Sequence, residues 1–408
     1  MQLSLFDHVK NVYSETSSPL DNETLYARVA ARAGITEGEL NTRSPIGKSG
    51  APRSKLKRAI RWHQQTMKSS GWIEKTGDRG VWKLTRNGKK QLTKVSAKYS
   101  IVAFSTDLGV AIWGNCTNAF KNLNEKISLV LTSPPYPLKQ SRAYGNVNVD
   151  QYIDFICSSL EPMIKQLKPG GSVTINLSND IFEHRSPARS LYLEKLTIAL
   201  SERLGLSLMD RLIWNCPNKP PGPVQWCSKH EHRFQLNYGY EPILWFSNDP
   251  LKVLSNNNRV LIPHTEKHLK LIQSGGEKRS ADYSDGAHRI RPGNYSNATP
   301  GRIPKNVITI PNTCHSQRQY KARARELNLP VHGAPMPLAL AKFLIEFLTP
   351  LGALVAEPFG GSLTTALAAE ELGRRWIATE IFWEYLCGGA ARFNNAVVNP
   401  FFSTVAKM

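Results

Sequence analysis

One stretch of the chain joins an apolar run to a rigid corner: Leu129-Val130-Leu131-Thr132-Ser133-Pro134-Pro135-Tyr136-Pro137. A short apolar run that ends in turn residues is typical of a buried strand in a parallel sheet. The strand must end at Pro134-Pro135, because proline cannot donate a hydrogen bond to a neighbouring strand. Open α/β sheets bind ligands at the carboxyl ends of their strands. The hydroxyl of Ser133 and the flat ring of Tyr136 therefore predict a site for a planar, amino-bearing molecule such as a nucleobase, with an ordinary Pro-Pro turn as the alternative.

Length and composition bound the class of protein. The chain's 408 residues correspond to about two or three domains, and a hydrophobic content of 41% is typical of a soluble globular protein. Residues 1–7 lack the features of a signal peptide, and no apolar run approaches the roughly 18 to 20 residues that span a bilayer. The six cysteines form no CxxC pair, and the ten histidines form no HExxH pattern. We therefore expect a cytoplasmic protein with no membrane partner, no disulfide framework and no metal.

The chain carries a formal net charge of +20, from 52 basic and 32 acidic side chains, which predicts a polyanionic partner. This charge is concentrated in two segments. Residues 1–100 carry 19 Lys and Arg against 8 Asp and Glu, and residues 251–330 carry 14 against 5. Because these segments account for the whole excess, we expect two surfaces that face DNA.

Residues 1–95 predict a small DNA-binding domain. A cap at Asp21 begins an amphipathic helix that Gly34 ends, and residues 53–69 form a second, strongly basic helix. Residues 72–75 and 81–84 then form a β-hairpin. Helices followed by a hairpin resemble a winged helix-turn-helix, in which a basic helix enters a DNA groove. A basic domain for protein contacts is the alternative, and the candidate DNA-binding residues are Arg53, Lys55, Lys57, Arg58 and Arg61.

Residues 100–250 alternate between strand and helix patterns, after a linker or first strand at 96–110. Pro169-Gly170-Gly171 ends one helix before the next strand, and the alternation resumes after residue 330. Such alternation implies a mostly parallel sheet with right-handed crossovers. The expected strands are 110–113, 129–131, 172–177, 212–214, 237–246, 352–356 and 376–379, and the expected helices are 117–123, 150–167, 189–204, 336–348 and one that begins near 364.

A second corner follows the strand at 352–356 and is rich in glycine: Glu357-Pro358-Phe359-Gly360-Gly361-Ser362. Glycines between a strand and a helix let a ligand approach the backbone, and the helix N-terminus offers amide donors. Glu380 lies at the tip of the next strand, about 20 residues further on, where an acidic side chain can accept hydrogen bonds from ribose hydroxyls. The corner has neither a GxGxxG nor a Walker pattern, so a tight turn without a ligand is the alternative.

The two corners, in this order, resemble the amino-methyltransferases of DNA. Residues 332–337, His-Gly-Ala-Pro-Met-Pro, are similar to that family's His-Pro-x-x-x-Pro motif. The order matches the family's circularly permuted β group, and the Ser-Pro-Pro-Tyr corner is similar to that of its cytosine-N4 enzymes. The resemblance covers residues 105–395. It implies an α/β fold, with a circularly permuted, Rossmann-like sheet of the S-adenosylmethionine-dependent methyltransferases, beside the small winged helix-turn-helix domain.

The same resemblance divides the chain and assigns its residues. It implies a catalytic half at 100–250, a target-recognition segment at 251–330 and a cofactor-binding half at 331–408. The catalytic corner would be Ser133, Pro134, Pro135 and Tyr136. S-Adenosylmethionine would be held by Asn115, Met336, Glu357, Phe359, Gly360, Gly361, Ser362, Thr364 and Glu380. The sequence departs from the family's pattern at three positions, where Glu357 replaces an aspartate, Leu363 a common glycine and Gly333 a proline.

Residues 215–330 are rich in Asn, Ser, Gly, Pro and basic side chains, with little apolar periodicity. Loops longer than about 15 residues are unusual unless they are functional. Because Arg, Lys and Asn side chains can read base edges, this segment is the candidate for sequence readout, with Arg233 as a DNA contact. Trp226, His230 and Glu241 are further candidates, although Trp226 and Glu241 are as easily structural.

The resemblance implies methyl transfer from S-adenosylmethionine to the exocyclic N4 of cytosine in double-stranded DNA, with a cognate restriction endonuclease as a functional partner. The Ser133 oxygen and the Pro134 carbonyl would accept from the amine, and Tyr136 would stack on the flipped base. An adenine-N6 enzyme of the same fold is one alternative, although Asp or Asn then usually replaces the serine. A non-catalytic DNA-binding regulator is another. Ring-carbon methylation is disfavoured, because it needs a cysteine after a proline and no cysteine here follows one.

Overall fold

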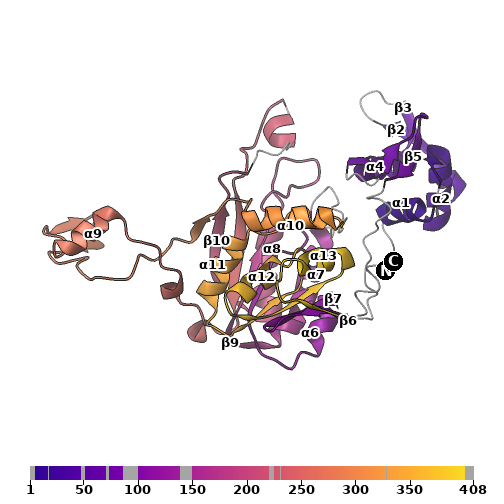
Figure 1. The fold of residues 1–408 in the computed structure, drawn as a ribbon. Helices are drawn as coiled ribbons and strands as arrows, with labels where there is room; N and C mark the ends of the chain where they lie inside the picture. Colours follow the sequence, from indigo (N-terminus) through magenta and orange to yellow (C-terminus); the bar gives the residue numbers. More distant parts are fainter. Residues whose placement is uncertain are drawn as a thin grey trace. The chain divides into compact units, whose positions relative to one another are not determined.

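The computed structural model describes residues 5–16, 18–46, 51–69, 73–85, 100–137, 149–219, 225–229, 231–327 and 329–399. The chain divides into two compact units, Met1–Thr93 and Lys94–Met408 (Figure 1). Within these described ranges, the first unit contains one apolar core and the second contains two. No helix among the described residues combines the length and the apolar character that crossing a bilayer requires.

The N-terminal unit packs helices against a small antiparallel sheet. Its elements are α1 (Leu5–Ser14), β1 (Leu20–Asp21), α2 (Asn22–Ala33), α3 (Glu37–Asn41), β2 (Arg43–Ile46), β3 (Ala51–Ser54), α4 (Lys55–Ser69), β4 (Ile73–Lys75) and β5 (Val81–Leu84). The three-stranded sheet has the order β1-β5-β4, and β2 pairs with β3. Asp21 caps α2 by accepting hydrogen bonds from the amides of Glu23 and Thr24, and Gly34 ends the helix with φ at 68°.

The structure contains the predicted helix after Asp21, the basic helix and the hairpin. Arg53 is a correction, because it lies on β3 just before α4 and not on the basic helix. The sequence predicted no element at α1, at α3 or at the β2–β3 hairpin. Helix α1 is stabilised by burial of Val9, Val12 and Tyr13 in the core of the unit, which no local cap signal reveals. Trp72, predicted to start the hairpin, lies outside the described residues.

The second unit is built on a ten-stranded sheet. Its strands are β6 (Ser100–Ser105), β7 (Gly109–Gly114), β8 (Ile127–Thr132), β9 (Leu167–Asn176), β10 (Ser207–Asn215), β11 (Tyr240–Ser247), β14 (Val307–Thr309), β15 (Leu354–Glu357), β16 (Arg375–Glu380) and β17 (Val397–Val398). They lie in the order β14-β10-β11-β9-β8-β15-β16-β7-β6-β17. The five central strands β9, β8, β15, β16 and β7 are parallel. The strand at 129–131 is thus at the centre of the sheet and ends at Thr132, before the two prolines.

The prediction of a mostly parallel sheet holds for this centre and is wrong at its edges. β11 is antiparallel to both β9 and β10, and β6 is antiparallel to both β7 and β17. Pro169-Gly170-Gly171 also differs from the prediction, because it lies inside β9. Gly170 has φ at 77°, and a Cβ there would lie 1.7 Å from the carbonyl oxygen of Lys252. The glycine therefore allows the chain after β11 to cross β9 closely.

Helices cover both faces of the sheet. One face packs on α11 (Leu338–Leu348), α12 (Thr364–Glu371) and α13 (Trp383–Ala390), and the other packs on α6 (Cys116–Lys121), α7 (Val149–Ile164) and α8 (Tyr192–Leu204). Within β8, Leu129 and Leu131 enter the first core and Val130 enters the second. A strand that is buried on both faces favours apolar residues on both, which explains the run Leu129-Val130-Leu131 in the sequence.

The segment 215–330 is more ordered than its composition predicted. It contains η1 (Gln225–Lys229), η2 (Pro250–Lys252), η3 (Asn257–Val260), α9 (Glu266–Gln273), the hairpin of β12 (Ala281–Tyr283) and β13 (His288–Ile290), and α10 (His315–Glu326), as well as β11 and β14. Figure 1 shows α9 standing away from the sheet. An isolated antiparallel β-bridge between Ile262 and Arg302 joins the two ends of the segment that contains α9, β12 and β13. Helix α10 instead returns to pack against α13.

Candidate active site

Four strands bring polar side chains to one edge of the sheet. β8 and β9 are parallel, so Ser133, just after β8, and Asn176, at the end of β9, lie at the same edge. β11 runs antiparallel to β9, which puts Glu241, near its start, at that edge as well. β10 is antiparallel to β11 and ends there too, and Lys219 follows it. The mixed topology thereby adds residues that a purely parallel sheet would place elsewhere.

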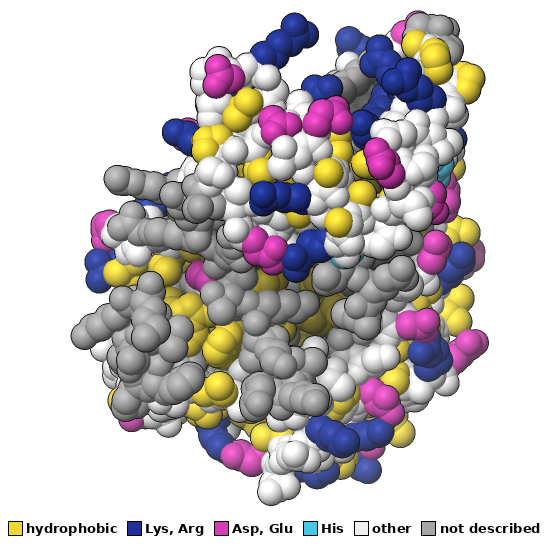
Figure 2. Space-filling view, turned by 90° about the vertical axis from the view of Figure 1, so that its right-hand side faces the viewer, with side chains coloured by type: hydrophobic (Ala, Val, Ile, Leu, Met, Phe, Trp, Pro, Cys, Tyr) yellow, Lys and Arg dark blue, Asp and Glu magenta, His cyan; other side chains and the backbone are white. Residues whose placement is uncertain are grey.

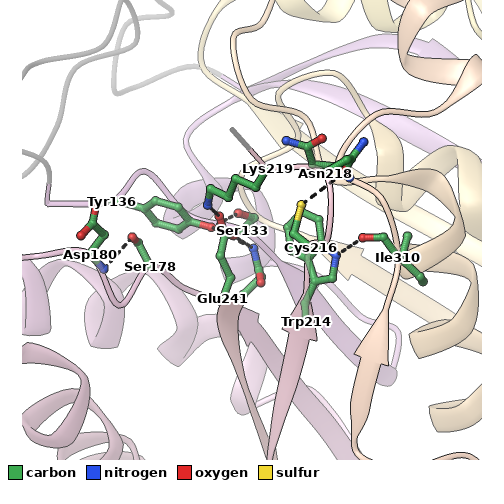
Figure 3. A network of polar contacts seen from close by, with 12 residues as sticks. Ser133, Tyr136, Ser178, Asp180, Trp214, Cys216, Asn218, Lys219, Glu241 and Ile310 are labelled. Atoms are coloured by element: carbon green, nitrogen blue, oxygen red, sulfur yellow. Dashed lines mark hydrogen bonds and ion pairs between the residues drawn. The ribbon is translucent and has the colours of Figure 1, made fainter. Parts of the chain in front are cut away.

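These four side chains and Tyr136 form a group that we call the carboxylate network: Ser133, Tyr136, Asn176, Lys219 and Glu241. Figure 3 shows Ser133, Tyr136 and Lys219 converging on Glu241. The Tyr136 hydroxyl donates to Glu241 Oε2 at 3.0 Å and lies 3.1 Å from Ser133 Oγ. Asn176 Nδ2 donates at 2.8 Å both to that hydroxyl and to Glu241 Oε2. Lys219 Nζ donates to Glu241 Oε1 at 2.9 Å.

The donor and acceptor capacity of each group sets the direction of these hydrogen bonds. A carboxylate only accepts, so the single proton of the Tyr136 hydroxyl points to Glu241. The Asn176 amide faces the same carboxylate and must present its nitrogen, because two acceptor oxygens repel each other. The Tyr136 oxygen can then only accept from Ser133. Consequently the Ser133 proton points to Tyr136, and the remaining lone pairs of Ser133 Oγ can accept a hydrogen bond from a ligand.

The ionisable side chains of the carboxylate network are largely buried from solvent. Burial, together with the adjacent Glu241 carboxylate, raises the pKa of Tyr136 well above its ordinary value, so the hydroxyl keeps its proton. Burial would lower the pKa of Lys219, but the Glu241 carboxylate more than offsets this and raises it. The side chains of Lys219 and Glu241 are only 19% and 14% exposed. Their ion pair therefore fixes the position of the Glu241 side chain at the end of the Tyr136 hydrogen bond.

The glycine corner is shaped by close packing around Glu380. Gly361 has φ at 50°, and a Cβ there would lie 3.0 Å from His332 Nε2. The Gly361 amide donates to Glu380 Oε2 at 2.7 Å, and the Phe382 amide donates to Oε1 at 2.8 Å. Burial raises the pKa of Glu380 to about 7, although these backbone bonds oppose the shift. Gly361 thus leaves room for the His332 ring, and each oxygen of the Glu380 carboxyl keeps a lone pair for a further donor, which the predicted ribose contact requires.

One cavity of about 390 Å³ connects the two corners. The catalytic corner, Ser133, Pro134, Pro135 and Tyr136, lines one part, and Asn115, Met336, Phe359, Gly361 and Glu380 line another. Segment 251–330 adds four polar residues to the lining, Asn312, Thr313, Gln317 and Lys321. Most of the predicted catalytic and cofactor-binding residues thus meet at one place. Among the described residues, no three His, Cys, Asp or Glu side chains group as metal ligands.

Four predicted cofactor-binding residues do not line this cavity: Glu357, Gly360, Ser362 and Thr364. Glu357 is buried and accepts a hydrogen bond from Thr132 Oγ1 at 2.7 Å, and burial raises its pKa to about 8. The carbonyl of Ser362 and the hydroxyl of Thr364 accept from Arg392 Nη1 at 2.7 and 2.9 Å. In this structure these residues support the backbone of the glycine corner and do not face the cavity.

Two residues of the network were not identified from the sequence. Asn176 ends a predicted strand next to β8, and a polar side chain at a carboxyl strand end is a signal that could have found it. Lys219 lies in a proline-rich loop 86 positions after Ser133, and only the order of the strands brings the two together. Glu241 was considered as either functional or structural, and it lies at the centre of the network.

The candidate DNA-binding residues lie outside the cavity. Arg53, Lys55, Arg58 and Arg61 are exposed, and Figure 2 shows Lys and Arg side chains gathered along the upper edge of the N-terminal unit. Lys57 is partly engaged within the unit, because its ammonium lies 2.9 Å from Glu23 and over the ring of Tyr26. In the second unit Arg233 is exposed, with φ at 44°. Trp226 lies on η1, and His230 is outside the described residues.

Comparison with known proteins finds a match for each unit. The family model described as DNA methylase matches residues 127–389, and the Mrr N-terminal domain matches residues 4–94. The type II methyltransferase M.PvuII of Proteus hauseri is 32% identical over 71% of this chain and 85% of its own length. The DNA adenine methyltransferase YhdJ of Escherichia coli K12 is 25% identical over 72% of this chain and 85% of its own length.

The fold agrees with these matches. The solved structure of the cytosine-N4-specific PvuII DNA methyltransferase has a TM-score of 0.56 and 28% identity, and the alignment covers 75% of this chain and 94% of that one. The prediction of a Rossmann-like methyltransferase sheet is therefore confirmed. On this evidence the chain belongs to the DNA methylase family, whose members act on DNA with S-adenosylmethionine as the methyl donor.

Proposed function

We propose that this methyltransferase transfers the methyl group to the exocyclic N4 of cytosine in double-stranded DNA. The observation that carries the proposal is the direction of the Ser133 hydroxyl. Its proton is committed to Tyr136, so Ser133 Oγ faces the cavity as a neutral acceptor. An amino group can donate to it, and the carbonyl of Pro134 is a second acceptor beside it.

These acceptors address the main chemical difficulty of the reaction. The exocyclic amine of cytosine is a poor nucleophile, because its lone pair is delocalised into the ring. Hydrogen bonds from its two N–H groups to Ser133 and Pro134 favour a tetrahedral nitrogen and stabilise the positive charge that develops there. The target base must leave the duplex to reach the cavity, and the ring of Tyr136 offers it a stacking surface. The rate would come chiefly from positioning and electrostatics.

The second corner would hold the methyl donor. When bound, S-adenosylmethionine supplies an electrophilic methyl group. Glu380 would accept from the ribose hydroxyls, and Gly361 and Phe359 would bring the backbone close to the ligand. Asn115 and Met336 line the same cavity and complete this part of the proposed site.

We assign DNA recognition to two parts of the chain. The N-terminal unit, with Arg58 and Arg61 exposed on α4, would bind the phosphate backbone in the manner of a winged helix. Segment 251–330 would be the target-recognition segment of a circularly permuted, β-group enzyme, and Arg233 a DNA contact just before it. The similarity to type II methyltransferases such as M.PvuII supports a place in a restriction-modification system with a cognate endonuclease.

Methylation of adenine at N6 is the second candidate. YhdJ, a DNA adenine methyltransferase, covers as much of the chain as M.PvuII at lower identity. An adenine amine could also donate to Ser133. The serine and the greater similarity to PvuII methyltransferase favour cytosine.

Analysis of the product decides between the two. Duplex DNA methylated by the purified protein would be digested to nucleosides and separated by mass spectrometry. We expect N4-methylcytosine as the product. N6-methyladenine alone would establish the second candidate, methylation of adenine, and 5-methylcytosine would overturn the mechanism. Ser133→Ala should lower turnover with little effect on binding of DNA or S-adenosylmethionine. Ser128→Ala is the matched control, since this buried serine lies on β8, the strand that Ser133 follows, and outside the cavity.

A further inference from the structure

We propose that the proton released by the target amine passes through Ser133 and Tyr136 to Glu241, in concert with methyl transfer. This proposal rests on the proposed function, because it needs an amine whose N–H donates to Ser133. It assigns a role to Glu241 and Tyr136 that base stacking alone does not require.

Methyl transfer creates a proton that must leave the site. As the amine nitrogen forms a bond to the methyl carbon, the carbon–sulfur bond breaks and sulfur keeps its electron pair. The nitrogen then carries a positive charge and is a far stronger acid than a carboxylic acid. Of its two acceptors, the Pro134 carbonyl has no proton to pass on, whereas the Ser133 hydroxyl does.

The hydrogen bonds of the network already point along the required path. Ser133 donates to Tyr136 over 3.1 Å, and Tyr136 donates to Glu241 Oε2 over 3.0 Å. When the amine proton moves to Ser133 Oγ, the Ser133 proton moves to the Tyr136 oxygen and the Tyr136 proton moves to Glu241. Each hydroxyl gains one proton and loses one, and Glu241 becomes a neutral carboxylic acid. No additional base is needed.

The surroundings of Glu241 suit a carboxylate that receives a proton. Lys219 bonds to Oε1, which leaves Oε2 directed toward Tyr136. Asn176 donates both to Oε2 and to the Tyr136 oxygen, and so holds the two relay atoms together. With 14% of its side chain exposed, Glu241 can return the proton to solvent after the product leaves.

The discriminating variant is Tyr136→Phe, which keeps the stacking ring and removes the relay oxygen. At saturating DNA and S-adenosylmethionine we expect its single-turnover rate to fall roughly 100-fold, as for loss of acid–base catalysis, with DNA affinity within about twofold of wild type. The wild-type rate should fall in D₂O and the residual Tyr136→Phe rate should not. Tyr152→Phe is the matched control, because it removes a buried hydroxyl that has no hydrogen-bond partner among the described residues and lies outside the cavity.

A second variant tests the end of the path. Glu241→Gln keeps the size of the side chain but cannot take up a proton, and a Glu241→Gln/Lys219→Met double variant avoids an unpaired buried ammonium. Both should bind DNA normally and turn over slowly. A Tyr136→Phe rate within twofold of wild type, or a wild-type rate insensitive to D₂O, would overturn the relay even if the product is N4-methylcytosine. A product other than N4-methylcytosine would instead count against the proposed function.

Discussion

Replacement of Glu380 by glutamine tests the cofactor corner with the least change in shape. Both carboxylate oxygens accept backbone amides, Gly361 at one and Phe382 at the other. Glutamine offers only one acceptor oxygen, so its amide nitrogen must face one of these N–H groups or the ribose. The variant therefore loses a hydrogen bond to a charged acceptor wherever the amide settles.

The expected loss follows from the strength of such bonds. A hydrogen bond to a charged group contributes about 1.5 to 3 kcal/mol, and 1.4 kcal/mol corresponds to a tenfold change in Kd. The Kd for S-adenosylmethionine should accordingly rise roughly 10- to 100-fold. Because burial raises the pKa of Glu380 to about 7, the affinity of the wild-type protein should also fall as the pH drops below 7. The glutamine variant should lack this pH dependence.

Isothermal titration of the purified protein with S-adenosylmethionine between pH 6 and 8 measures both effects. Thermal unfolding of the same samples shows whether the variant keeps its fold. Glu125→Gln is the control, because it removes an exposed carboxylate that pairs with Arg375 outside the cavity. A wild-type Kd in a folded Glu380→Gln protein would remove Glu380 from the cofactor site.

Three further changes probe other parts of the structure. Burial raises the pKa of Glu357 to about 8, so the free energy of unfolding that this group contributes falls as the pH rises from 4.5 to 8. Glu357→Gln should remove this pH dependence and raise Tm most at pH 8, which thermal unfolding at pH 5 and pH 8 measures. Leu363→Gly relieves a φ of 58° but removes a fully buried leucine, so denaturant unfolding should show a net loss of roughly 1 to 3 kcal/mol. Deletion of residues 1–95 should weaken duplex binding and lower its salt slope by about 0.9 for each lost phosphate contact, without loss of S-adenosylmethionine binding; an unchanged slope would assign the unit another role.

The sequence predicted the two corners well because each is specified by local chemistry. Prolines at 134 and 135 end a strand whatever surrounds them, and β8 ends at Thr132 as expected. Gly361 follows β15 and Glu380 ends β16, two strands that apolar runs identify, and the parallel pairing of these strands brings the two residues together. Local signals of this kind do not depend on the rest of the fold.

The remainder of the site depends on which strands are neighbours, and that information is not local. A strand pattern at 237–246 is the same whether the strand runs parallel or antiparallel to β9. Only the antiparallel arrangement puts Glu241, at the beginning of β11, beside Asn176, at the end of β9. The same reversal sends β10 back to this edge, so that Lys219 can reach Glu241. The expectation of a mostly parallel sheet therefore did not predict that Asn176, Lys219 and Glu241 lie together next to the catalytic corner.

The departures from the family pattern are accommodated by local contacts in this chain. Leu363, where the resemblance predicts glycine, offsets the strain of its left-handed backbone by filling the core between Gly360 and Gly389. Its side-chain atoms lie 2.8 and 2.7 Å from the positions that Cβ atoms of these two glycines would take. Glu357, in place of an aspartate, reaches Thr132 at the end of β8, directly before Ser133. That bond links the strand of the glycine corner to the strand of the catalytic corner. A buried carboxyl thus joins the two corners, and we expect a substitution of Glu357 to affect both of them.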